Sequence, residues 1–166
     1  MKLKLLKILL FPTIVTFLNG YNPKFANFIL EMVHKYNFYN CDNTIIQKVF
    51  SAVDGEDIRV NVSKFDNIRN QISLTTTFGY PNDSVYIYSV IRKDNNKCYV
   101  DETAVITFNK SCIEVQNSDP QFKLKGRTAD FFWTQNKIGV IKILKPLNTN
   151  QCLVIFEKDF ASKQDH

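Results

Sequence analysis

The chain has 166 residues and a formal net charge of +5, with 22% charged and 45% hydrophobic residues. This length suits one domain with its own core. Residues of both charge signs are interspersed, which argues against a nucleic-acid-binding protein, because such proteins concentrate basic residues on one face. Three of the bases are Lys2, Lys4 and Lys7, and no acid lies in 1–20, so residues 21–166 carry 18 bases and 16 acids.

Residues 1–20 have the plan of a secretory signal peptide, with a lysine-rich start, an apolar run and a polar exit. The apolar run is shorter than the roughly 20 residues that cross a bilayer. We expect cleavage after Gly20, a mature chain of residues 21–166 without a stable membrane anchor, and a secreted or periplasmic location. An uncleaved anchor is the alternative, because Leu18 stands where a small residue is preferred.

All four cysteines, Cys41, Cys98, Cys112 and Cys152, lie in the predicted mature chain. Four cysteines in an exported protein are typical of two disulfides. The chain has no Cys-x-x-Cys pair, the pattern that would indicate a zinc site. The strand predicted between Cys98 and Cys112 would hold those two apart. Of the two pairings left, we prefer Cys41–Cys98 with Cys112–Cys152 over Cys41–Cys112 with Cys98–Cys152. The preferred pairing would fasten the N-terminal helices to the central hairpin.

Two helices are predicted at the start of the mature chain. Asn22-Pro23 is a helix-start pattern, and an apolar face with helical spacing follows it. The residues of that face are Phe25, Phe28, Ile29, Met32, Val33 and Tyr36. A second helix is predicted from Asp42 or Asn43 to Gly55. We expect the pair to form a hairpin whose apolar face is core rather than a ligand-binding or membrane-facing surface.

The rest of the chain predicts short strands, organised around residues 84–112. Here two strands flank a polar turn at 93–97, and the returning strand is interrupted at Asp101-Glu102. Further strands are predicted at 58–63, 72–78, 112–115, 122–124, 128–134, 138–144 and 152–156. No internal repeat is visible. The order of helices followed by seven to nine strands predicts one α+β domain: a helical hairpin packed on an antiparallel, strongly curved or barrel-like sheet.

Few residues are arranged for catalysis. The histidines are His34, on the first predicted helix, and His166, the last residue. His34 could act as a base with Asp or Glu in a small hydrolase, but no partner for it is evident. No Gly-x-Ser-x-Gly turn or glycine-rich phosphate loop occurs, and we interpret Asp101-Glu102 as a solvated bulge. We therefore predict no catalytic, metal or cofactor site and favour a non-enzyme.

The run Phe131-Phe132-Trp133 is the candidate partner-binding site. In a strand Phe131 and Trp133 share one face, and Phe132 takes the other. An aromatic residue on each face predicts either core on both sides or an exposed apolar patch that binds a partner. We expect an exported binding protein, inhibitor- or immunity-like, that acts on another protein. A carrier that encloses an apolar ligand is a further alternative.

The segment 98–152 resembles small exported lysozyme inhibitors, which are antiparallel β-proteins. Phe132-Trp133-Thr134, a turn at 135–137 and Cys152 follow Cys98 in the order seen in that family. The family's Ser-Gly-x-x-Tyr loop has no counterpart here, and the N-terminal helices are foreign to the family. The resemblance agrees with an inhibitor-like role, but we assign no site residue in this chain from it.

Three glycosylation sequons begin at Asn61, Asn82 and Asn109. Their use depends on whether the source is bacterial or eukaryotic, which the sequence does not reveal. The oligomeric state is likewise not encoded in any pattern of the chain.

The first testable expectation concerns export. Intact-mass measurement of the exported protein should give a chain that begins near Tyr21, because residues 1–20 have the signal-peptide plan. A mass that includes Met1 to Gly20 would make this segment a retained anchor instead.

Overall fold

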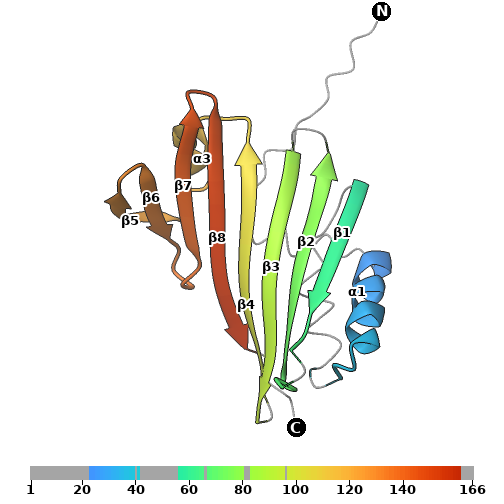
Figure 1. Ribbon diagram of the computed structural model, residues 1–166. Helices are drawn as coiled ribbons and strands as arrows, with labels where there is room; N and C mark the ends of the chain where they lie inside the picture. The colour runs from blue at the N-terminus through green and yellow to red at the C-terminus, as the bar shows by residue number, and fades with distance from the viewer. Residues whose placement is uncertain are drawn as a thin grey trace, which may run out of the picture.

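The computed structural model describes residues 23–39, 41, 56–65, 67–80, 83–95 and 97–161. These residues form one antiparallel eight-stranded sheet and two helices (Figure 1). The elements are α1 Pro23–Lys35, β1 Glu56–Ser63, β2 Gln71–Tyr80, β3 Asp83–Asp94, β4 Lys97–Phe108, α3 Cys112–Asn117, β5 Lys123–Thr128, β6 Phe131–Gln135, β7 Ile141–Asn148 and β8 Gln151–Ala161. The predicted second helix and signal peptide lie outside the described residues, so the helical hairpin is not tested.

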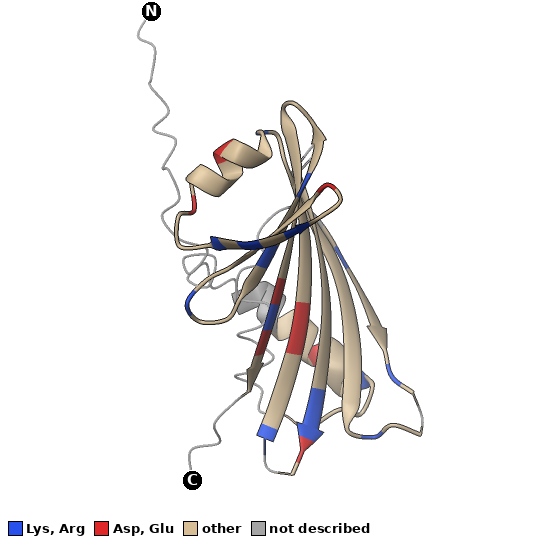
Figure 2. Cartoon of the chain, turned by 90° about the vertical axis from the view of Figure 1, so that its left-hand side faces the viewer, with Lys and Arg blue, Asp and Glu red and all other residues tan. Residues whose placement is uncertain are grey.

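The sheet is open. Its strand order is β1-β2-β3-β4-β8-β7-β6-β5, so β1 and β5 lie at opposite edges. Figure 2 shows that the β5–β6 edge curls toward the side on which α3 lies. The expected strong curvature is therefore present at this edge, but the sheet does not close as a barrel does. The fold is mostly β, and several strands are longer than predicted.

The topology repeats, although the sequence shows no repeat. Strands β1 to β4 form one four-stranded meander and β5 to β8 another, and the two join where β4 pairs with β8. Each half also has its own disulfide. Cys41–Cys98 and Cys112–Cys152 each link a cysteine that precedes a meander to the second residue of its last strand. This is the preferred pairing.

Both described helices pack on the same face of the sheet, which we call the helix face. The first core cluster joins α1 to the first meander: Ile29, Val33, Phe38, Cys41, Val62, Ile72, Leu74, Ile87, Ile91, Cys98 and Val100. The second joins α3 to the other meander: Val115, Phe122, Leu144, Cys152, Val154 and Phe156. By strand alternation the inward residues of all eight strands share this face. The opposite face, the open face, has no described helix on it.

The buried stripe of α1 is narrower than predicted. Ile29 and Val33 are completely buried, whereas Phe28 is 46% and Tyr36 is 41% exposed. Successive helical residues are about 100° apart, so Phe28 lies beside the stripe centred on Ile29. Tyr36 lies beyond the end of the helix at Lys35. The side chain of Phe25 lies outside the described residues.

The strand predicted at 112–115 is wrong, because this segment begins the helix α3. A capping box starts the helix: Ser111 Oγ accepts a hydrogen bond from the Glu114 backbone N–H at 3.2 Å, and the Glu114 carboxylate accepts one from the Ser111 backbone N–H at 2.8 Å. The Ser-x-x-Glu pattern that produces such a box is visible in the sequence. The four residues from Cys112 to Val115 are too few for a strand pattern to outweigh this helix signal.

Several strand limits differ from the prediction. β4 runs without interruption through Asp101-Glu102. A turn at Ala129, whose φ is 51°, divides the predicted strand 128–134 between β5 and β6. β7 starts later than predicted and continues through Pro146, where a register irregularity with β8 accommodates the missing backbone donor. The segment 146–151, which we expected to be a loop between the strands predicted at 138–144 and 152–156, therefore belongs mostly to β7 and β8.

The disulfides give the second testable prediction. Replacing Cys112 and Cys152 together with Ala should lower the free energy of unfolding by about 4 kcal/mol, because the bridge closes a 40-residue loop. Urea denaturation measures this difference. Non-reducing peptide mapping is the control for connectivity, and a recovered peptide that joins Cys98 to Cys112 would contradict the topology.

Candidate functional site

β6 directs its three aromatic residues to different faces. Phe132 pairs with Leu144 on the helix face, and Trp133 pairs with Ile143 on the open face. Phe131 shares the open face with Trp133 by strand alternation. The single strand thus contributes to a surface on each side of the sheet.

On the open face a row of apolar and aromatic side chains crosses five strands. We define the aromatic row as Tyr86, Val105, Ile155, Ile143 and Trp133, which lie opposite one another on β3, β4, β8, β7 and β6. Tyr86 is 41% and Trp133 is 38% exposed, whereas Val105 and Ile155 are half-buried and Ile143 is buried. No described helix covers this row.

Charged residues flank the aromatic row without entering it. By strand alternation Glu157 and Asp159 follow Ile155 on the same face of β8. Arg92 and Asp101 form an exposed ion pair at 3.7 Å. At the other end Lys145 Nζ lies 5.0 Å from the centre of the Phe131 ring. The row therefore has an apolar centre and a charged rim.

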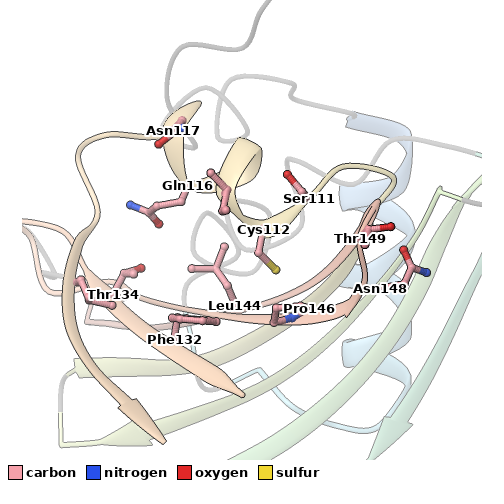
Figure 3. A pocket seen from close by; sticks show the side chains of 12 residues that line it. Ser111, Cys112, Gln116, Asn117, Phe132, Thr134, Leu144, Pro146, Asn148 and Thr149 are labelled. Carbon is pink, nitrogen blue, oxygen red and sulfur yellow. The ribbon is translucent and has the colours of Figure 1, made fainter. Parts of the chain in front are cut away.

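On the helix face an apolar cavity of about 450 Å³ lies between α3 and the curled end of the sheet (Figure 3). Its floor comes from β6 and β7, its roof from α3 and its side from β5. The lining residues are Ser111, Cys112, Ile113, Gln116, Asn117, Leu124, Phe132, Thr134, Leu144, Pro146, Asn148 and Thr149. Phe132, the middle residue of the aromatic run, therefore forms part of the floor of this cavity.

A buried ion pair adjoins the cavity. Lys142 Nζ lies 3.3 Å from Asp119 Oδ2 and 4.5 Å from the centre of the Phe122 ring, and the Lys142 side chain is 1% exposed. Burial lowers the pKa of the Lys142 ammonium below its ordinary value, and the charge of Asp119 opposes this change. The pair ties the segment after α3 to β7. The sequence did not indicate it, because Lys142 lies in an apolar strand far from Asp119.

A second ion pair, with a buried carboxylate and a half-buried ammonium, lies where the two meanders meet. Glu102 is 6% exposed, and its Oε1 lies 2.7 Å from Lys158 Nζ on the neighbouring strand. Within the described part of the chain its Oε2 has no hydrogen-bond partner, and the same holds for the buried hydroxyls of Thr76 and Ser89 on this face. Burial raises the pKa of Glu102, and the attraction of Lys158 only partly offsets this. The predicted solvated bulge at Asp101-Glu102 is thus wrong, because Glu102 points inward from a regular strand.

His34 is half-buried, and its ring stacks on Tyr39 with the ring centres 4.7 Å apart. Among the described residues no carboxylate forms an ion pair with it. Within the same residues no group of three or more His, Cys, Asp or Glu side chains is arranged to hold a metal ion. The hydrolase alternative thus gains no geometric support from this part of the chain.

Comparison with known protein families, curated proteins and solved structures finds no match for this chain. In the described part of the chain, no helix combines the length and apolar character of a membrane span. The two disulfides indicate an oxidising environment of the kind found outside the cell or in the periplasm.

The buried carboxylate predicts a pH dependence of stability. A raised pKa in the folded state means that Glu102 contributes stability below its unfolded pKa, near 4.5, and that this contribution is lost as the pH rises through the folded pKa. The free energy of unfolding of the wild type minus that of Glu102→Gln should therefore fall as the pH rises above about 4.5. Urea denaturation from pH 4 to pH 8 measures the difference.

Glu114→Gln is the contrasting control. The hydrogen bonds from Ser111 lower the pKa of Glu114, so the corresponding difference should fall as the pH decreases below about 4.5, and for this variant the pH series is extended to about pH 2. A flat or rising difference for Glu102→Gln would contradict the assignment of Glu102 as a buried, destabilised carboxylate.

Proposed function

We propose that this protein is an exported binding protein that holds or blocks another protein through the aromatic row, as inhibitors and immunity proteins do. The observation that supports this proposal most directly is the row itself, a run of aromatic and aliphatic side chains that crosses five strands and has no described helix over it. Large contiguous apolar patches on the surface of a soluble protein often mark interaction sites.

The composition of the open face supports a protein interface. Interface centres are enriched in Tyr, Trp and Phe and depleted of charge, and their rims are polar. Tyr86, Tyr88 and Trp133 provide large aromatic side chains that are about 40% exposed. The neighbouring strand β2 adds the hydroxyls of Ser73 and Thr75 on the same face. Tyrosine and serine together are typical of adaptable protein-binding surfaces.

The rim indicates the chemistry of the partner. Glu157 and Asp159 lie at one side of the aromatic row, and neither forms an ion pair with a described residue. A partner surface with an apolar centre and basic side chains beside it would complement both features. The acidic rim would then increase the rate of association more than the final affinity.

Export completes the proposal. Residues 1–20 serve as the signal peptide, and the mature chain acts in the periplasm or outside the cell, where its two disulfides are stable. Such a protein needs a rigid surface rather than reactive groups. The alternative, a hydrolase, would require His34. If the protein acts by binding instead, His34→Ala should leave the binding of its partner unaffected.

The test uses Trp133, the sole tryptophan of the chain. Immobilised mature protein is exposed to proteins from its native exported fraction, and a captured protein is purified and titrated by calorimetry. Trp133→Ala should weaken its binding at least about 30-fold, which is the size of an interface hot spot of about 2 kcal/mol. The Trp133 emission of the wild type should shift to shorter wavelength when the partner covers it.

Tyr39→Ala is the matched control, because Tyr39 is 64% exposed but lies beside α1, away from the aromatic row. A partner bound equally by Trp133→Ala and the wild type would place the binding surface elsewhere. Parallel titration with exported polysaccharides separates another ligand class: if only these bind and lose affinity with Trp133→Ala, the open face recognises carbohydrate and the proposal fails.

A further inference from the structure

The walls of the cavity under α3 restrict the charge of any ligand. None of the described residues that line it is Lys, Arg, Asp or Glu. A charged ligand group against these walls would therefore lose part of its water without gaining an opposite charge, which is unfavourable. The floor of Phe132, Leu144 and Pro146 instead offers apolar contact.

Three polar side chains of the wall, Ser111, Thr134 and Asn148, are already occupied within the chain. Each donates a hydrogen bond: Ser111 Oγ to Glu114 Oε2 at 2.7 Å, Thr134 Oγ1 to the Lys142 carbonyl at 2.7 Å, and Asn148 Nδ2 to Gln151 Oε1 at 2.9 Å. These hydrogen bonds hold the three side chains in place, so they are less available to a ligand.

Gln116 is only partly occupied. Its Nε2 donates to the Phe122 carbonyl at 2.7 Å, which orients the amide. Its Oε1 is buried and has no hydrogen-bond partner among the described residues. An unsatisfied buried acceptor is unfavourable, and a hydroxyl group on a ligand would supply the missing donor after a small movement of the side chain.

We propose that this cavity binds a small neutral amphiphile with a single hydrocarbon chain and a hydroxyl head, such as a long-chain alcohol or a monoacylglycerol. The chain would lie between α3 and the β6–β7 floor, and the hydroxyl would donate to Gln116 Oε1. The volume of about 450 Å³ falls in the range of small-molecule pockets, roughly 300–1,000 Å³. This site is separate from the aromatic row, because Phe132 and Trp133 point to opposite faces.

The test begins with the neutral dye N-phenyl-1-naphthylamine, whose fluorescence rises in apolar surroundings. The mature protein should enhance this fluorescence, and 1-dodecanol should displace the dye. Dodecanoate and dodecylammonium, which have the same chain but carry a charge, should need at least tenfold higher concentrations. The methyl ether of dodecanol should also displace the dye less well, because it has no donor for Gln116.

Ile113→Asp and Ile138→Asp form a matched pair of variants. Both isoleucines are exposed, by 74% and 77%, but only Ile113 lines the cavity. An acidic residue is compatible with the first turn of a helix, so Ile113→Asp should leave α3 intact. It should weaken dye binding at least tenfold, whereas Ile138→Asp and Trp133→Ala should leave dye binding unchanged.

Absence of dye binding to the wild type would overturn the proposal. So would equal losses in Ile113→Asp and Ile138→Asp, or displacement by dodecanoate as effective as by dodecanol. Equal displacement by dodecanol and its methyl ether would overturn the role assigned to Gln116. Loss of dye binding in Trp133→Ala would show that the two faces form one site.

Discussion

The pairing of β4 with β8 is the constraint on which the rest of the structure depends. Each strand is the last of a four-stranded meander, and the ladder between them extends from Tyr99 opposite Ala161 to Phe108 opposite Cys152. Since side chains alternate along paired strands, this register places the inward residues of both meanders on one face. A shift of this register by one residue would turn the buried side chains of one meander to the open face. The position of both cores on one side of the sheet and the continuous open face follow from this ladder.

The junction between the meanders is also where polar groups are buried. Glu102 and Lys158 face each other across the β4–β8 ladder, and the unsatisfied hydroxyl of Ser89 lies on the next strand. The two apolar clusters lie on either side of this polar segment, and Ala104 contacts both. A buried ion pair is weak evidence for stability but can favour one register over others. We therefore interpret Glu102–Lys158 as a register-specific contact at the position where the halves join.

The curl of the β5–β6 edge creates the two candidate surfaces. By turning toward α3, this edge encloses the apolar cavity on the helix face and leaves Trp133 at the end of the aromatic row on the open face. The short helix α3 is held over the cavity by its capping box and by Cys112–Cys152. One strand thus supports two recognition surfaces of different character, one flat with a charged rim and one concave and uncharged.

The sequence by itself determined the features that depend on local pattern. Alternation located most strands, such as β2 and β3, and opposite placement of Phe132 and Trp133 follows from the same period. The distance across β4 excluded Cys98–Cys112, which left the observed pairing as one of two. Only the tertiary structure decided the pairing of β4 with β8, because contacts between distant strands leave no local signal. The burial of Glu102 and Lys142 was likewise hidden, since a charged residue becomes buried only when a partner from another strand or loop meets it.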